Sequence, residues 1–322
     1  MTFSRRAVTA LLAASLAIPA TYAGAQSGKK TVAIVQIVEH PDLNNVREGA
    51  LAALAEAGFD DIEVIYESAQ GDMATGVQIA NRFAGISPDL IIPIGTPVAQ
   101  AVVRTTKSIP IVFGGIGDPL GAGIVQSLEK PGGNVTGTAS FTPVGPQLDL
   151  IQQMLPNVET IGILNNPAEA NSEASVNAFL AEAEKRGLKT KRELVTSSAE
   201  TLNAASNLVG RVDAIYIPTD STVVSSAEAV VRVALENKIP LFTAETGGVN
   251  RGALASTGFD WRGIGMETGR TAARVLNGEN PGDIAVTSAT SVATRLNQTT
   301  ADAIGVTFSD AIKAQAVEII GE

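Results

Sequence analysis

The side chains best suited to binding chemistry in this sequence stand just after short apolar runs. The first run is TVAIVQI, which begins at Thr31, and polar or ring-bearing residues follow its end directly. In open α/β sheets, ligands bind beyond the carboxyl ends of the strands, so residues at such ends are candidates for a binding site. The candidates are Gln36, Glu39, His40, Thr96, Asp118, Asn165, Asp220 and Glu245, with Asn171, which lies in the motif AEANS and does not directly follow a run.

Thr96 is a candidate for binding a carboxylate group. In the segment 94–97 a strand end is followed by a glycine, a hydroxyl and a proline, and proline is favoured at the first position of a helix. A helix N-terminus offers unpaired N–H groups and a partial positive charge, which together attract an anion. The alternative interpretation is that Thr96 only caps its own helix.

Three acidic residues are candidates for binding an ammonium group. Asp220 lies between a predicted strand and a predicted helix, so its carboxylate either binds a ligand cation or caps that helix. Asp118 precedes Pro119 and is equally typical of a turn, and Glu245 follows a further strand. Because three acids around one ammonium group would repel one another, at least one is expected to bind backbone or hinge groups.

The remaining candidates carry amide or imidazole groups. Asn165 and Asn171 could both reach a ligand from the second half of the chain, or could be ordinary loop and cap asparagines. Gln36 and Glu39 lie at the end of the first strand beside His40, which could stack on an aromatic ligand or donate a hydrogen bond to it. A lone histidine is more often a surface or core residue.

Several kinds of chemistry are not expected. The chain has one histidine and no cysteine, which removes thiolate catalysis and most metal sites. No Gly-x-Ser-x-Gly motif supplies a nucleophile. The segment 115–120 begins like a dinucleotide-binding motif but lacks its third glycine, and no Gly-Lys-Ser/Thr phosphate loop occurs. We therefore expect no catalytic residue, no metal and no cofactor.

The elements that position these residues follow from the alternation of apolar runs and amphipathic stretches, which has the spacing of βα units. A run such as TVAIVQI, rich in β-branched residues, indicates a strand buried on both faces, as in parallel sheets. The predicted strands are 31–37, 62–67, 90–94, 109–113, 160–164, 189–194, 214–217, 240–242 and 252–259. The predicted helices are 42–57, 72–84, 97–105, 145–154, 170–186, 199–208, 221–237 and 264–277.

This pattern predicts an α/β fold of two doubly wound parallel-sheet lobes joined by a three-segment hinge. Residues 31–140 and 251–282 are assigned to the N-terminal lobe, and residues 141–250 and 283–322 to the C-terminal lobe. The late βα unit indicates that the chain returns to its first lobe. The crossings are expected near 135–141, 243–252 and 282–286, and closure of the lobes on a ligand would rotate these segments.

Residues 1–25 are predicted to be an export signal. Arg5 and Arg6 precede an uncharged run at 7–20, and Ala23-Gly24-Ala25 has the small residues of a cleavage site. The run is too short to span a membrane. Cleavage after Ala25 and a periplasmic location are expected, by either the general or the twin-arginine route.

Composition narrows the classes of partner. The formal net charge of −10 at pH 7 argues against nucleic acid and anionic membranes, since both attract basic surfaces. A length of 322 residues with 45% hydrophobic residues allows a large core and favours two lobes over one. We expect a monomer with a small-molecule ligand.

A series of longer motifs runs through the chain in a fixed order. They are VAIVQIVEHP (32–41), DLIIPIGTPVAQA (89–101), IPIVFGGIGDPLGAGIV (109–125), EKPGGNVTG (129–137), DAIYIPTDSTVVS (213–225) and IPLFTAETGGVNRGALAS (239–256). Together they resemble the ABC-transporter substrate-binding proteins of the tryptophan-import type, over essentially the whole chain after the signal. The resemblance implies a type I periplasmic binding protein fold, a ligand held in the cleft, and delivery of that ligand to a membrane permease without chemistry.

An amino acid is the expected ligand, with its carboxylate at the Thr96 helix and its ammonium group at Asp220. Sugar sites usually sandwich rings between aromatic residues, and only 4% of this chain is aromatic. Four aromatic residues could line an apolar side-chain pocket or belong to the core: Phe113, Phe141, Tyr216 and Trp261. A periplasmic sensor or a hydrolase on the same fold are the alternatives.

Overall fold

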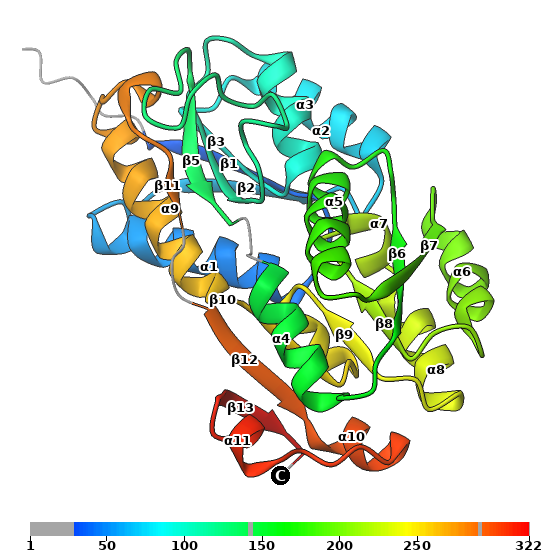
Figure 1. Ribbon diagram of the computed structural model, residues 1–322. Helices are drawn as coiled ribbons and strands as arrows, with labels where there is room; N and C mark the ends of the chain where they lie inside the picture. Colours follow the sequence, from blue (N-terminus) through cyan, green and yellow to red (C-terminus); the bar gives the residue numbers. More distant parts are fainter. Residues whose placement is uncertain (1–28, 141–143, 289–291, 322) are drawn as a thin grey trace, which may run out of the picture.

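The protein is built as two α/β lobes that lie against each other (Figure 1). The structure is a computed structural model, and it describes residues 29–140, 144–288 and 292–321. The predicted export signal and Phe141 therefore lie outside the described residues. In the described parts of the chain, every helix is too short or too polar to span a lipid bilayer.

The first lobe is a six-stranded parallel sheet covered by helices. Its strands are β1 (Thr31–Gln36), β2 (Glu63–Ser68), β3 (Leu90–Ile94), β4 (Ile111–Ile116), β5 (Val135–Ala139) and β11 (Thr287–Ser288). They lie in the order β11-β5-β4-β3-β1-β2. Its helices are α1 (Pro41–Glu56), α2 (Met73–Ile86), α3 (Thr96–Thr105) and α9 (Trp261–Leu276), with a short 3₁₀ helix η3 (Pro281–Asp283).

The second lobe contains a seven-stranded sheet. Its strands are β6 (Thr160–Asn165), β7 (Lys189–Leu194), β8 (Ala214–Ile217), β9 (Leu241–Thr243), β10 (Ala255–Phe259), β12 (Val292–Asn297) and β13 (Ala316–Ile320), in the order β13-β12-β10-β9-β8-β6-β7. Among the pairs of described strands in this sheet, only β10–β12 is antiparallel. Its helices are α4 (Val144–Met154), α5 (Ala170–Lys185), α6 (Thr201–Leu208), α7 (Ser221–Val224), α8 (Ala227–Glu236), α10 (Gln298–Ile304) and α11 (Asp310–Lys313), with 3₁₀ helices η1 (Ser198–Glu200) and η2 (Thr246–Arg251).

Helices cover both faces of each sheet, which explains the uninterrupted apolar strands. In the first lobe α1 and α9 lie side by side on one face, and α2 and α3 lie on the other (Figure 1). Every residue of β3 is buried, and in β1 only the first residue is partly exposed. The second lobe has separate apolar clusters under α4 and α5 and under α6 and α8. The predicted α/β fold with two doubly wound lobes is therefore confirmed.

The chain passes between the lobes between β5 and α4, between β10 and α9, and between β11 and β12. The prediction for 251–282 places the whole segment in the first lobe, whereas its strand β10 pairs with β9 and β12 of the second sheet. The prediction for 283–322 places that segment in the second lobe, whereas β11 pairs with β5 of the first sheet. Both differences arise because a strand's partner is set by distant residues and not by its local pattern.

The predicted helix 221–237 is interrupted, giving α7 and α8. The Ser225 hydroxyl donates to the carbonyl of Thr222 over 2.7 Å, and the Ser226 hydroxyl donates to Thr201 over 2.8 Å. Serine side chains that bond nearby backbone compete with the helical hydrogen bonds. The predicted strand 252–259 is likewise shorter, because η2 and a left-handed Gly252 precede it.

Helices α1 and α9 approach so closely that only glycine fits at their contact. A β-carbon on Gly265 would lie 2.3 Å from the carbonyl oxygen of Val46, and one on Gly269 would lie 2.3 Å from that of Ala50. Gly49 meets the opposite helix in the same way. This backbone contact fixes the position of the α1 N-terminus, which reaches the boundary between the lobes.

Candidate ligand-binding site

A pocket lies between the two lobes at the carboxyl ends of their strands. Gly117 and Ser140 follow β4 and β5 of the first lobe, while Thr219 and Ala244 follow β8 and β9 of the second. The pocket is lined by Gly117, Ser140, Gln147, Asn171, Ser175, Thr219 and Ala244. This is the edge at which open α/β sheets bind ligands.

Two buried polar atoms in this pocket have no hydrogen-bond partner. They are Oδ1 of Asn171 and Oγ of Ser140, on side chains that are 7% and 5% exposed. The amide nitrogen of Asn171 donates to the carbonyl of Thr219 over 2.8 Å, which fixes the amide plane. Leaving a buried polar atom unpaired costs about 1–3 kcal/mol. The two atoms are therefore free to accept hydrogen bonds from a group that enters the pocket.

The wall of the pocket in the second lobe is held by a buried polar network. The Tyr216 hydroxyl donates to Oε1 of Gln147 over 2.6 Å, and Nε2 of Gln147 donates to the carbonyl of Thr257 over 3.2 Å. Phe179 stacks on Tyr216 with ring centroids 4.3 Å apart. Tyr216 is thus a core residue that orients Gln147. Of the two interpretations from the sequence, a pocket-lining residue or a core residue, the structure favours the second.

Two helix N-termini near the boundary between the lobes have no side-chain cap. Helix α3 begins after Gly95, whose φ of 102° suits glycine, and Thr96 is buried in its first turn. Helix α5 begins after Glu169, whose carboxylate instead accepts hydrogen bonds from the backbone of Ser221 and Thr222. Helices α3 and α5 contact each other across the lobes, and an uncapped helix N-terminus attracts anionic groups.

With the lobes in this arrangement the pocket is small. Its free volume is about 10 Å³, which is room for one water molecule. A larger hollow of about 440 Å³ lies between the lobes farther from the crossings, lined by residues of the 70–74 and 196–198 segments with Asn166 and Thr222. Its lining side chains are not among the buried unpartnered groups of the described residues. A ligand larger than water must therefore part the lobes to reach Asn171.

Asp220 lies inside the second lobe. Its Oδ1 accepts from the backbone N–H of Val223 over 2.8 Å, which caps α7, and its Oδ2 accepts from Asn166 N–H and the Ser172 hydroxyl over 2.5 and 2.6 Å. Burial, together with nearby Glu169, raises the pKa of Asp220 to about 7. This geometry favours the capping interpretation over the ammonium-binding one.

A pH dependence of stability follows from Asp220. Its folded pKa of about 7 exceeds the ordinary value of 3.8, so its contribution is complete below pH 4 and is lost as the pH rises through 7. Relative to Asp220→Asn, the wild-type free energy of unfolding should fall by up to about 1.4 kcal/mol per pH unit in that window. Urea unfolding of both proteins at pH 4.5, 5.5, 6.5 and 7.5 measures it, and parallel pH curves would contradict it.

Four other predicted residues are tied into their own lobes. Gln36 donates to Asn44 and to the carbonyl of Val38, both over 2.7 Å. Glu39 lies on the surface, where it accepts from the Tyr66 hydroxyl. Asp118 accepts a hydrogen bond from the Gly121 N–H over 2.8 Å. Asn165 donates to the Ser172 hydroxyl over 3.1 Å and accepts from Arg192 over 2.6 Å.

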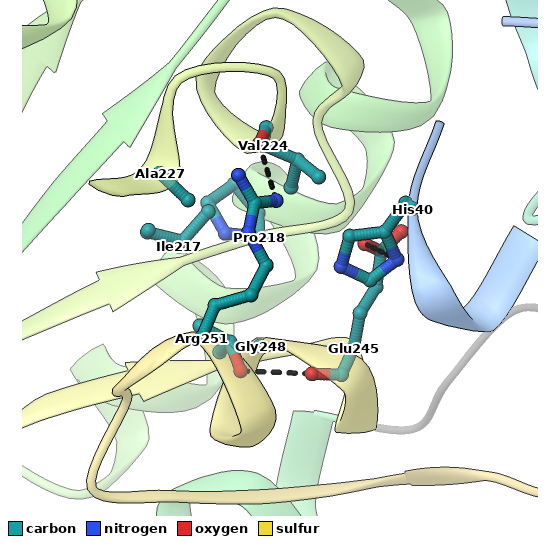
Figure 2. Close-up of a pocket in the computed structure, with 9 residues that line it drawn as sticks. His40, Ile217, Pro218, Val224, Ala227, Glu245, Gly248 and Arg251 are labelled. Carbon is teal, nitrogen blue, oxygen red and sulfur yellow. Dashed lines mark hydrogen bonds and ion pairs between the residues drawn. The ribbon is translucent and has the colours of Figure 1, made fainter. Parts of the chain in front are cut away.

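His40 and Glu245 meet across the lobes beside a second small pocket (Figure 2). Nδ1 of His40 lies 3.6 Å from Oε2 of Glu245 and accepts from the N–H of Asp42 over 3.3 Å. Burial, with Arg251 nearby, lowers the pKa of His40 to about 3. Burial and the neighbouring carboxylates raise the pKa of Glu245. The contact therefore joins two groups that are favoured in their neutral forms.

Of the nine predicted residues, Asn171 alone lines the pocket between the strand ends. Ser140, Thr219 and Gln147 also line this pocket and were not predicted from the sequence. Ser140 and Thr219 follow strands in the same way as the chosen candidates, so the strand-end rule could have found them, while Gln147 carries no local signal. No group of three or more metal-ligating side chains occurs among the described residues.

Residues 31–320 match the family model described as ABC transporter substrate binding protein. A relative named tyrosine-binding protein, from Clostridioides difficile strain R20291, is 39% identical over 86% of this chain and 81% of its own length.

Two solved structures resemble the chain over its length. An ABC domain in complex with L-Trp from Streptococcus pneumonia is 33% identical, covers 91% of this chain and 100% of its own, and has a TM-score of 0.87. A ligand-free, open structure of a substrate binding protein with adhesive properties from Clostridium difficile is 38% identical with the same coverages and a TM-score of 0.67. Family match, fold and interlobe pocket agree, and the protein belongs to the ABC transporter substrate-binding protein family.

Proposed function

We propose that this substrate-binding protein captures an aromatic L-amino acid between its lobes and delivers it to a membrane permease. The observation that carries the proposal is the pair of unpartnered polar atoms, Asn171 Oδ1 and Ser140 Oγ, in the interlobe pocket. An α-ammonium group can donate to both atoms, and the uncapped first turns of α3 and α5 favour the carboxylate. The relatives named for tyrosine and bound to L-Trp support an aromatic side chain.

The lobes are arranged more as in a closed form than as in an open one. The TM-score is higher with the L-Trp complex than with the ligand-free, open structure, although the sequence identity is lower. A ligand stabilises the form of the protein with which it makes the most contacts. A ligand that donates to Asn171 of one lobe and Ser140 of the other should therefore stabilise the closed form. Capture and release then require only rotation at the three crossings, with no chemical step.

The location and assembly follow the sequence predictions. We propose that the chain is exported, cleaved after Ala25, and works in the periplasm as a monomer without a nucleic-acid partner. The acidic net charge of −10 and the small-residue site at 23–25 support these proposals.

The test is a thermal-shift screen of residues 26–322 against the twenty amino acids, followed by calorimetry. L-Tryptophan or L-tyrosine should raise the melting temperature by several degrees and bind at micromolar concentrations or below. N-Acetyl-L-tryptophan and tryptamine, which lack the ammonium and carboxylate groups respectively, should bind at least tenfold more weakly. Recovery of unchanged ligand checks that no turnover occurs. Stabilisation by sugars alone, or by no amino acid, would contradict the proposal.

A further inference from the structure

A hydrogen-bonded contact joins the lobes at a place that does not line the proposed ligand pocket. Asp42, in the first turn of α1, is fully buried. Its Oδ2 accepts from the backbone N–H of Gly247 over 2.8 Å, and its Oδ1 accepts from the Thr246 hydroxyl over 3.1 Å. Asp42 belongs to the first lobe and η2 to the second, so both of its oxygens are used by the opposite lobe.

The surroundings of this contact are close-packed. A β-carbon on Gly247 would lie 2.9 Å from Cε1 of His40 and 3.0 Å from Oδ1 of Asp42. The backbone at Gly247 does not have a positive φ, so the glycine is required by the approach of the other lobe and not by local geometry. Figure 2 shows His40 reaching from the first lobe toward Glu245, directly before η2.

Both sides of the contact are held firmly by their own lobes. Asn297 donates to the carbonyl of Val249 over 3.0 Å, and Thr243 donates to that of Glu245 over 2.8 Å, which ties η2 to the second sheet. On the first lobe, α1 is fixed by its glycine contacts with α9. A contact between two rigid supports forms or breaks with the rotation of whole lobes.

We propose that Asp42, Thr246 and Gly247 form an interlobe latch that fastens the closed form and so sets ligand affinity and release rate without contacting the ligand. This inference rests on the proposed function, because it assumes that a ligand is captured between the lobes. Opening would expose Asp42, Thr246 and Gly247 N–H to water, so the latch adds to closure independently of which ligand is bound. The three residues are positioning residues: they act on the ligand through the lobes.

The test compares Asp42→Asn and Gly247→Ala with the control Asp89→Asn. Asp89 also accepts a backbone N–H, from Thr31 over 2.9 Å, but at the amino end of the first sheet, away from the cleft. With L-tryptophan as the probe, the two latch variants should bind about tenfold more weakly, with the loss in a faster dissociation rate. The control should match the wild type, and the ligand-free melting temperatures of the latch variants should stay within a few degrees of it.

A second measurement needs no ligand. The chain has no cysteine, so spin labels can be placed at Val77→Cys on α2 and Leu202→Cys on α6, which are exposed positions on opposite lobes. The wild type should show a population with a short interlobe distance, and Gly247→Ala should reduce it. Equal distance distributions in both proteins, or no short distance in the wild type, would overturn the latch. Failure of the proposed function looks different: the wild type would then bind no amino acid, whatever the labels report.

Discussion

Replacing Asn171 by leucine is expected to weaken binding of the aromatic amino acid by about a hundredfold. Leucine keeps the volume of the side chain but removes Oδ1, which has no partner inside the protein, and the amide that orients it against Thr219. Ser140→Ala removes one acceptor and should cost about tenfold. Calorimetry with L-tryptophan and L-tyrosine measures both losses.

The diagnostic feature is the stability of the ligand-free protein. Asn171→Leu removes a buried oxygen without a partner but also the hydrogen bond to Thr219, so it should melt within a few degrees of the wild-type temperature while binding is lost. Asn177→Leu is the matched control, because Asn177 is an exposed residue of the same helix. If Asn171→Leu binds as tightly as Asn177→Leu, the ligand lies elsewhere, and the larger hollow beside Asn166 and Thr222 becomes the next place to test.

Replacing Gly265 by alanine is expected to lower the free energy of unfolding by roughly 3 kcal/mol, as overpacking at a rigid contact does. The added β-carbon would lie 2.3 Å from the carbonyl oxygen of Val46 and 2.8 Å from its α-carbon, and neither backbone atom can rotate away. Helices α1 and α9 must separate, which exposes apolar surface of the first lobe. Thermal and urea unfolding of the ligand-free protein measure the loss.

Gly85→Ala makes the same chemical change but is expected to raise the free energy of unfolding slightly. Gly85 is an exposed residue of α2, and a β-carbon there meets nothing within 4 Å. Alanine is the better helix former by about 1 kcal/mol, so this variant should be slightly more stable than the wild type. Similar stabilities for the two variants would show that α1 and α9 can adjust, and the close contact would then carry little of the stability of the first lobe.

The secondary structure was largely predictable because its signals are local. Buried strands such as β1 and β3 are continuous apolar runs, and most helices end at glycine or polar residues close to the predicted bounds. The sheet membership of β10 and β11 was not predictable, since their partners β12 and β5 are distant in sequence or follow a crossing. The close contact between α1 and α9 could not be predicted either, because the sequence shows a glycine within a helix only as a residue of low helix propensity.

The candidate site was predictable as a region but not residue by residue. The sequence favours Asp220, which stands between a predicted strand and a predicted helix, over Asn171 as the residue that binds the ligand. Their environments differ in the folded chain: Asp220 finds three donors within its own lobe, whereas Asn171 leaves one oxygen unused. Which polar group remains for a ligand depends on the complete set of hydrogen bonds, and that set exists only after folding.

The interleaved path of the chain between the lobes has a consequence for biosynthesis. The first sheet lacks the second of the two helices on one face until α9, at 261–276, has been made, and it lacks its edge strand until β11 follows. Neither lobe is a contiguous stretch of sequence, so no truncated chain that ends before residue 261 contains a complete core. A nascent chain therefore cannot complete the core of the first lobe before α9 has been made. Such a delay would suit the export that we propose, if it follows the general route, because an incompletely folded chain can thread through a translocation channel.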